Sequence, residues 1–73
     1  MPKYKEIALA LKERIVEGKY QEGSKLPEQE SLAREFKTSC VTIRKAIQLL
    51  IDEGLLYTRR GSGTFIRSNI RQD

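Results

Sequence analysis

Basic side chains with a clear chemical use are concentrated in two short segments. Arg44 and Lys45 lie within a helical pattern that starts near residue 40, and Arg59 and Arg60 directly precede the sequence Gly-Ser-Gly. A guanidinium group donates hydrogen bonds to phosphate oxygens or to the edge of guanine, and an ammonium group binds phosphate as a point charge. These residue types are therefore suited to binding an anionic partner.

The sequence offers little of what catalysis or metal binding needs. It contains no histidine, which is the commonest general base, and a single cysteine, Cys40. The usual zinc ligand sets therefore cannot be assembled, and no internal disulfide can form. We expect no metal, no cofactor and no enzyme activity. A lone cysteine also fits a reducing compartment, and we expect a cytoplasmic location.

The size and composition are those of one small folded domain. The chain has 73 residues, of which 38% are hydrophobic and 33% are charged. It lacks the run of about 18 apolar residues that a transmembrane helix needs. Its N-terminal segment is charged throughout, which argues against a signal peptide. We therefore expect no membrane partner.

The net charge of +4 is distributed unevenly along the chain. Residues 1–27 carry six basic and four acidic side chains (net +2), residues 28–53 carry four and five (net −1), and residues 54–73 carry four and one (net +3). A mild positive charge permits a nucleic acid or an anionic membrane as partner but identifies neither. Two positive segments thus flank a central segment whose basic character depends largely on Arg44 and Lys45.

Apolar residues at intervals of three and four predict a first helix near the N-terminus. They are Tyr4, Ile7, Ala8, Leu11 and Ile15. Pro2 precedes this pattern and Gly18 follows it, as start and stop signals. Residues 18–27 contain two glycines and one proline and predict a loop, with room for a short strand near residues 25–26.

Two further helices are predicted on either side of a short polar turn at residues 37–39. The second helix follows Pro27 and has an apolar side. That side consists of Leu32, Ala33 and Phe36. Ser39 is a good N-cap for the third helix, and Gly54 is expected just after its end. The buried face of the third helix is expected to contain Ile43, Ala46, Ile47 and Leu50. Two such helices joined by a short turn are typical of a helix-turn-helix motif.

The periodicity changes after Gly54 and predicts a β-hairpin, here called the wing. Residues 55–59 and 64–67 are rich in β-forming types, and the glycines of residues 60–63 permit a tight turn. Because a lone hairpin is marginal in water, we expect Leu55, Tyr57 and Phe65 to pack it on the helices. The order of elements predicts a mainly α fold with a small β-hairpin: a winged helix-turn-helix domain of three helices and a two-stranded wing, over residues 1–67.

Four segments resemble the DNA-binding domain of the GntR family of bacterial transcription regulators. They are residues 4–27, SLAREF (31–36), VTIRKAIQLLIDEGLL (41–56) and RRGSGTF (59–65). The wing sequence is most similar to the HutC-like subfamily. The resemblance implies a domain, in a repressor, that binds double-stranded operator DNA. It also implies a C-terminal domain that forms a homodimer and binds a small-molecule effector, and residues 68–73 are expected to begin the linker to that domain.

The resemblance implies that the third helix enters the major groove and reads base edges from its N-terminal half. The candidate contact residues are Ser39, Cys40, Val41, Thr42, Arg44, Lys45 and Gln48. Arg44 is the strongest candidate, because it lies opposite the apolar face and matches an arginine of the family motif. Each candidate also has a structural alternative, which is capping for Ser39 and Thr42 and ordinary solvation for the others.

The wing tip is implied to approach the minor groove. Its candidate contact residues are Arg59, Arg60, Gly61, Ser62 and Gly63. Arginine gains from the negative potential of a narrow minor groove, whereas the glycines also serve the turn and need no DNA for that role.

Three residues depart from the family pattern. Glu28 replaces the serine that usually caps the second helix, and we expect it to cap poorly. Glu30 replaces an arginine that often contacts DNA, and it either accepts a hydrogen bond from cytosine N4 or points to water. Cys40 replaces a second arginine, either as a small neutral groove residue or as a redox switch. We expect an operator that differs from the usual palindrome, or a low affinity.

Two other functions compete with operator binding. A winged helix can serve as a protein–protein interaction module, which the net charge of −1 over residues 28–53 slightly favours. RNA binding has little support, because three Tyr and two Phe provide no evident aromatic stacking surface.

Overall fold

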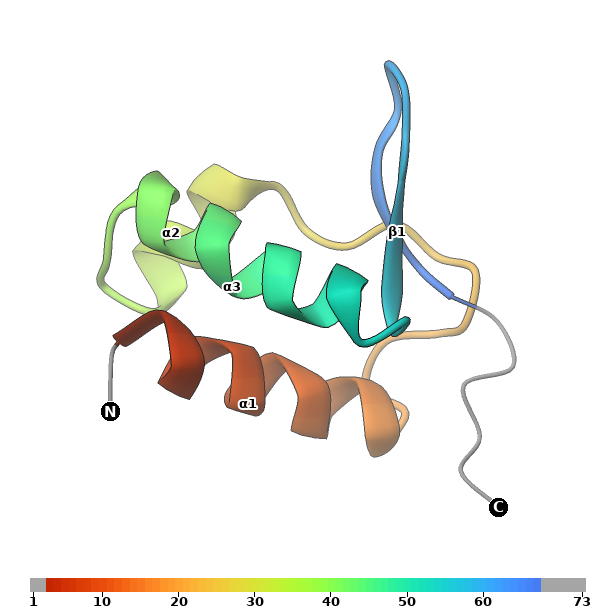
Figure 1. Ribbon diagram of the computed structural model, residues 1–73, viewed down its shortest axis with the longest axis horizontal. Helices are drawn as coiled ribbons and strands as arrows, with labels where there is room; N and C mark the ends of the chain where they lie inside the picture. Colours follow the sequence, from red (N-terminus) through yellow and green to blue (C-terminus); the bar gives the residue numbers. More distant parts are fainter. Residues whose placement is uncertain (1–2, 68–73) are drawn as a thin grey trace.

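The computed structural model describes residues 3–67 as three helices followed by a two-stranded antiparallel hairpin (Figure 1). The elements are α1 (Lys3–Val16), α2 (Gln29–Glu35), α3 (Cys40–Asp52), β1 (Leu56–Arg59) and β2 (Gly63–Ile66). This order confirms the predicted winged helix-turn-helix. Pro2 and the expected linker at residues 68–73 lie outside the described residues.

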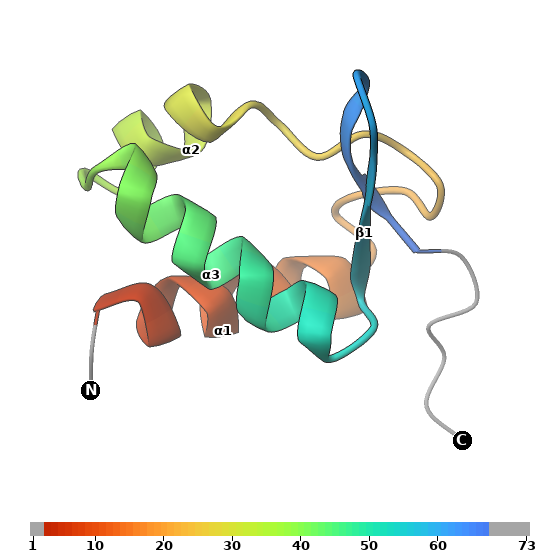
Figure 2. The ribbon, with the colours of Figure 1, turned by 45° about the horizontal axis from the view of Figure 1, so that its top comes forward.

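The helices surround one small apolar core. α1 lies along one side of α3, α2 covers the N-terminal end of α3, and the wing stands at its C-terminal end (Figures 1 and 2). The largest fully buried side chains come from all three helices and both strands: Leu11, Leu32, Ile43, Leu50, Leu56 and Ile66. The apolar faces predicted for α1 and α3 are buried, except that Tyr4 is only partly buried. No helix within residues 3–67 is long and apolar enough to cross a bilayer.

The two ends of α2 are held in different ways. At its start, Glu28 occupies the N-cap position, but its side chain makes no capping hydrogen bond and instead accepts one from Lys25 Nζ at 3.2 Å. The prediction of a poor cap is therefore confirmed. At its end, Lys37 has a φ of 55°, and its amide and that of Thr38 donate to the carbonyls of Arg34 and Ala33 at 3.2 and 2.9 Å.

α3 begins and ends as its sequence predicts. The Ser39 hydroxyl accepts a hydrogen bond from the Thr42 amide at 3.2 Å, so Ser39 is the N-cap. After the C-cap, the amides of Gly54 and Leu55 donate to the carbonyls of Ile51 and Leu50 at 3.0 and 2.9 Å. These two bonds satisfy carbonyls that the helix end leaves free and turn the chain into the wing.

The wing packs on the helices through a different set of residues from the one expected. β1 and β2 pair with Leu56 opposite Ile66 and Tyr57 opposite Phe65. Leu55, Leu56 and Ile66 are buried in the core, whereas Tyr57 and Phe65 are only partly buried and do not belong to it. The prediction was right for Leu55 and wrong for the two aromatic residues. Because neighbouring residues in a strand point to opposite faces, burial of the Leu56–Ile66 pair turns the Tyr57–Phe65 pair outward.

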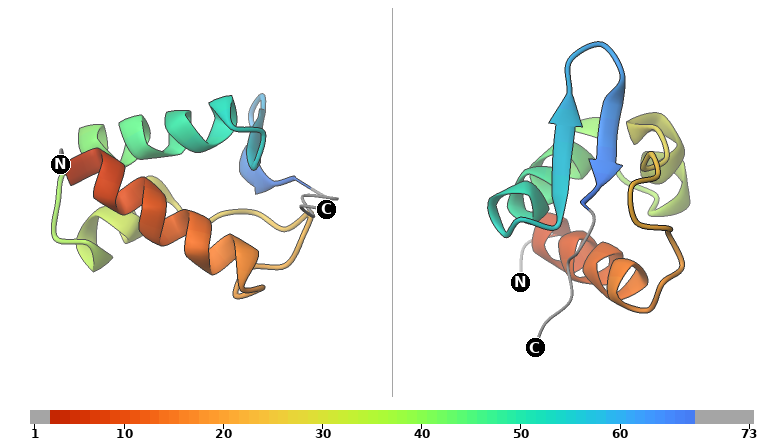
Figure 3. Two further views of the ribbon diagram at one scale, coloured as in Figure 1. Left: turned by 60° about the horizontal axis from the view of Figure 1, so that its bottom comes forward. Right: turned by 90° about the vertical axis from the view of Figure 1, so that its right-hand side faces the viewer.

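The loop before α2 pairs with the free edge of β2, and the two run side by side in Figure 3. Lys25 forms an isolated antiparallel bridge with Phe65, so the segment where a short strand was predicted contributes a single bridged residue instead. The Leu26 amide donates to the Thr64 carbonyl at 2.8 Å, and the Ile66 amide donates to the Ser24 carbonyl at 2.8 Å. These bonds connect the wing to the segment that leads into α2 and hold the two in a fixed relation.

Candidate nucleic-acid interface

The outer face of α3 is exposed to solvent. Ile43, Ala46 and Ile47 turn inward, which leaves the residues between them on the opposite face. Those exposed residues are Val41, Arg44, Lys45 and Gln48. Val41 exposes 54% of its surface, although it is a large apolar residue. The same 3.6-residue period that builds the core therefore presents this row of side chains to solvent.

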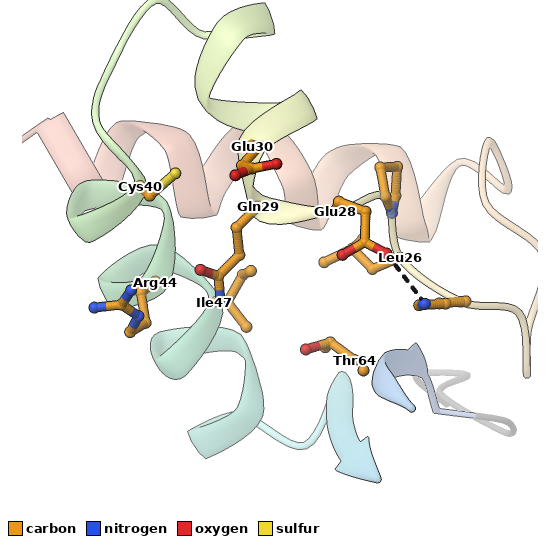
Figure 4. A pocket seen from close by; sticks show the side chains of 11 residues that line it. Leu26, Glu28, Gln29, Glu30, Cys40, Arg44, Ile47 and Thr64 are labelled. Atoms are coloured by element: carbon orange, nitrogen blue, oxygen red, sulfur yellow. Dashed lines mark hydrogen bonds and ion pairs between the residues drawn. The ribbon is translucent and has the colours of Figure 1, made fainter. Parts of the chain in front are cut away.

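Arg44 is available for a partner outside the domain. Within residues 3–67, no ion pair, side-chain hydrogen bond or cation–π contact engages its guanidinium group. Figure 4 shows the side chain projecting outward from α3. The N–H donors of the Arg44 side chain are thus not used for contacts within the described residues.

Arg14 shows the opposite arrangement. Its guanidinium group makes an ion pair with Glu35, donates a hydrogen bond to the Tyr20 hydroxyl at 3.0 Å and lies 5.0 Å from the centre of the Phe36 ring. The interaction with Glu35, followed by that with Tyr20, raises the pKa of Arg14 above its ordinary value, because both favour the charged form. Arg14 is therefore a structural residue that ties α1 to α2.

The other polar residues of α3 have contacts of their own. The Lys45 ammonium group lies 5.9 Å from the centre of the Tyr4 ring, which places it beside the start of α1. The Gln48 amide donates to Asp52 at 3.0 Å, one helical turn further on. The Thr42 and Ser39 hydroxyl groups are 3.1 Å apart, so both participate in the helix cap.

A cleft of about 470 Å³ is lined by residues of α2 and the loop before it, of α3 and of β2 (Figure 4). Its lining includes Glu30, Cys40, Arg44 and Gly63, so four of the predicted site residues border one space. Glu30 comes from the first turn of α2 and Cys40 from the first turn of α3. Glu30 is exposed, whereas Cys40 is only partly exposed and packs against the core.

Seven residues that line the cleft were not among the predicted site residues: Lys25, Leu26, Pro27, Glu28, Gln29, Ile47 and Thr64. Gln29 immediately precedes Glu30, and Thr64 follows Gly63, so adjacency to predicted residues was the available signal. Lys25 had none, because only the pairing of its backbone with Phe65 brings it here.

The wing tip extends away from the helices (Figure 1). Its predicted residues Arg59, Arg60, Gly61, Ser62 and Gly63 are all exposed. The Ser62 amide donates to the Arg59 carbonyl at 3.0 Å and closes the turn. Gly63 has a φ of 123°, and a Cβ atom there would lie 2.7 Å from Lys25 Cε, so the position suits glycine alone.

The two predicted groups of basic residues thus project from one scaffold. α3 presents Arg44 and Lys45, and the wing presents Arg59 and Arg60, with the acidic side chains of Glu28 and Glu30 on the cleft between them. Exposed guanidinium and ammonium groups are suited to binding phosphate and base edges. Within residues 3–67, no group of His, Cys, Asp or Glu residues is arranged to hold a metal ion.

Residues 3–66 match the family of bacterial regulatory proteins called the gntR family. The chain is 41% identical over 73 residues to the HTH-type transcriptional regulator GmuR of Bacillus subtilis (strain 168), covering 100% of this chain and 31% of GmuR. It is 36% identical over 66 residues to the mannosyl-D-glycerate transport/metabolism system repressor MngR of Escherichia coli (strain K12), covering 90% of this chain and 28% of MngR. The chain therefore spans less than one third of the length of these relatives.

The fold is similar to that of solved regulator domains. The crystal structure of AraR(DBD) in complex with operator ORX1 has a TM-score of 0.85 and 39% sequence identity, covering 90% of this chain and 80% of that chain. The family match spans all three helices and both strands described above. The chain therefore belongs to the gntR family of bacterial regulatory proteins.

Proposed function

We propose that this chain binds double-stranded operator DNA as the reading domain of a bacterial transcription regulator. α3 enters the major groove, and the wing tip lies at the adjacent minor groove. The observation that carries the proposal is the exposed Arg44, unengaged within the described residues, on the outer face of α3 in a domain similar to AraR(DBD), which was crystallised with an operator. Family membership supports the same function.

Arg44 is the main reader of base edges in this proposal. A guanidinium group can donate two hydrogen bonds to guanine, and such a pair contributes about 1–3 kcal/mol of discrimination. Val41 meets a thymine methyl group, and Lys45 and Gln48 bind the phosphate backbone. Ser39 and Thr42 are used mainly for the helix cap, with at most one further contact to phosphate.

Glu30 and Cys40 modify the sequence preference. A carboxylate near DNA is repelled by phosphate but accepts a hydrogen bond from cytosine N4, so Glu30 favours cytosine where an arginine favours guanine. Cys40 is small and uncharged and adds little affinity. The operator of this protein therefore differs from the one that two arginines at these positions select.

The test is selection of bound duplexes from a random pool by the full-length protein. An enriched inverted repeat is the expected result, because a symmetric dimer reads two half-sites about one helical turn apart. Recovery of a pool without any enriched sequence contradicts the proposal.

Replacement of Glu30 with Arg is expected to change the preferred base at one position of each half-site, and an unchanged consensus contradicts the role of Glu30.

Salt dependence and one matched pair of variants test the contact surface. DNA binding through several phosphates weakens by orders of magnitude between about 50 and 200 mM salt. Arg44→Gln is expected to cost about 1–3 kcal/mol of affinity for the selected duplex and to relax specificity at one position. Lys19→Gln removes an equal charge from the loop after α1 and is expected to have a much smaller effect. Equal losses in the two variants contradict a specific role of Arg44.

The whole protein is proposed to be a HutC-like repressor located in the cytoplasm. In this proposal residues 1–67 form the DNA-binding domain and residues 68–73 begin the linker to a C-terminal domain, which forms a homodimer and binds a small-molecule effector. The name of MngR, a repressor, supports the direction of regulation. Sedimentation of the full-length protein tests the dimer. A protein that is monomeric at concentrations at which it binds the selected DNA contradicts the dimer.

A protein–protein interaction module is the second candidate function. The net charge of −1 over residues 28–53 favours it, because acidic side chains oppose contact with DNA. The salt titration separates the two candidates. Absence of any salt-dependent binding to DNA, together with a protein ligand for α3, supports the second candidate and contradicts the first.

A further inference from the structure

Four side chains form a continuous stack on the outer face of the wing. The Arg59 guanidinium carbon lies 5.5 Å from the centre of the Phe65 ring. The Phe65 and Tyr57 rings are stacked, with centroids 5.9 Å apart and planes inclined by 23°. The Arg67 guanidinium carbon lies 5.7 Å from the centre of the Tyr57 ring. Two aromatic rings are thus enclosed between two cations.

Strand geometry produces this stack. Alternate residues of a strand share a face, so Tyr57 and Arg59 of β1 lie on the same side. Phe65 of β2 and Arg67, which directly follows β2, complete the row on that side. The pairing of Tyr57 with Phe65 places the two aromatic rings at the centre of the row. Core packing does not account for these rings, because Leu56 and Ile66 fill the inner face.

We propose that Phe65 is a positioning residue for Arg59 and holds its guanidinium group along the wing in the orientation that meets DNA. Tyr57 and Arg67 complete the stack and keep the Phe65 ring in place. The inference rests on the proposed function, since it assumes that the wing tip contacts DNA. It adds a role for Phe65 and Tyr57, which do not touch DNA themselves.

Stacking suits this role because it leaves the hydrogen-bond donors of arginine free. A guanidinium group that lies flat on a ring is held through its face, while its five N–H donors stay in its plane. An arginine that is already ordered loses less side-chain entropy on binding. The backbone bridge between Lys25 and Phe65 fixes the outer edge of β2 and so steadies the ring. Within residues 3–67, Arg60 has no such ring contact.

The first test uses the free protein and nuclear magnetic resonance. The ring current of Phe65 is expected to shift the Arg59 side-chain protons upfield, and Phe65→Leu is expected to abolish that shift. Phe65→Tyr keeps a ring and is expected to retain it. Arg59 protons at ordinary random-coil positions in the unmodified protein contradict the proposal, whatever the protein binds.

The second test is a double-mutant cycle on affinity for a fluorescent duplex recovered in the selection. Ordering a long side chain on binding costs entropy, so Phe65→Leu, which releases Arg59, is expected to weaken binding about fivefold. In an Arg59→Gln background, Phe65→Leu is expected to cause no further loss. A wing that is merely destabilised would lose affinity in both backgrounds, and equal losses in the two therefore contradict the positioning role.

Phe36→Leu is the matched control, because Phe36 forms the same kind of stack with Arg14 away from the wing. Its effect on affinity is expected to be independent of Arg59. The melting temperature of each variant is measured as well, to test whether unfolding causes a loss of affinity. Arg59→Gln alone tests the proposed wing contact. If it leaves affinity unchanged, the wing contact fails and this inference fails with it; if it weakens binding but the cycle is additive, only the positioning role fails.

Discussion

Glu28 and Lys37 determine how firmly α2 is held at its two ends. Glu28 has the extended backbone of an N-cap, with φ −60° and ψ 152°, but no side-chain oxygen accepts from the first turn. Lys37 adopts positive φ in a position where glycine is usual. The short helix that precedes α3 is therefore weakened at its start by a missing side-chain cap and at its end by a strained backbone conformation. Both residues can be replaced without changing the core.

Glu28→Ser is expected to stabilise the domain. A serine hydroxyl accepts a hydrogen bond from the first turn, and a good N-cap contributes about 1 kcal/mol. Loss of the exposed ion pair with Lys25 is expected to reduce this gain in stability by only about 0.5 kcal/mol. The measurement is urea unfolding, with Glu28→Ala as the control that removes the carboxylate without supplying a cap. A midpoint for Glu28→Ser that is equal to or below the original contradicts the prediction.

Lys37→Gly is also expected to stabilise the domain, by about 1 kcal/mol, because glycine adopts positive φ without the steric cost that a side chain incurs. Thermal unfolding measures the gain. Lys37→Ala removes the same charge but keeps a Cβ atom at positive φ, and it is expected to give no gain. If alanine stabilises as much as glycine, the cause is charge and the backbone explanation is wrong.

At the scale of elements, the wing depends on three connections. Leu56 and Ile66 bury its base, the loop before α2 pairs with the edge of β2, and the turn at residues 60–62 closes its tip. Gly63 lies where the turn meets β2, with a backbone conformation that L residues rarely adopt and Lys25 directly against it. The wing is therefore sensitive to a change at a single exposed residue outside the core.

Gly63→Ala is expected to destabilise the domain by about 1–3 kcal/mol, the usual cost of holding a side chain in a glycine-only backbone region. The new Cβ atom also meets Lys25 Cε at 2.7 Å, but this end of the lysine is flexible and can move. Urea unfolding of Gly63→Ala and of Gly63→Ala with Lys25→Ala separates the two causes. Recovery of most of the loss in the double variant would show that the contact, and not the backbone, is responsible.

At the scale of the whole molecule, one apolar core positions both groups of exposed basic residues, the pair in α3 and the pair in the wing. α3 is buried on one face between α1, α2 and the base of the wing, and its other face is left to solvent. The same core residues therefore fix the distance between the outer face of α3 and the wing. In a domain this small, loss of one core side chain is a large fraction of the total stability.

Ile43→Ala and Val41→Ala compare the two faces of α3 directly. Ile43 is fully buried, and its truncation is expected to cost about 2–5 kcal/mol, through lost burial and the cavity left behind. Val41 is exposed, and alanine is the better helix former, so Val41→Ala is expected to leave stability unchanged or slightly higher. Calorimetry measures both, and similar losses for the two variants contradict the assigned faces.

Much of the fold could be predicted from local sequence signals. The apolar period located α1 and α3, Ser39 and Gly54 marked the ends of α3, and the glycine-rich turn marked the wing. The inner face of the wing was assigned incorrectly, since Tyr57 and Phe65 are β-forming and apolar and yet face outward. Both faces of a short strand carry apolar residues here, so the sequence alone does not decide which face is buried.

The candidate site, like the fold, could be predicted from the sequence only in part. The sequence by itself determined which residues have suitable donors, namely the basic pairs in α3 and in the wing, because residue type and helical period are local properties. Only the tertiary structure decided that Glu30, Cys40, Arg44 and Gly63 border one cleft, that Lys25 joins them, and that Arg59 stacks on Phe65. Those relations depend on strand register and on contacts between segments distant in the chain, which no local pattern of residues specifies.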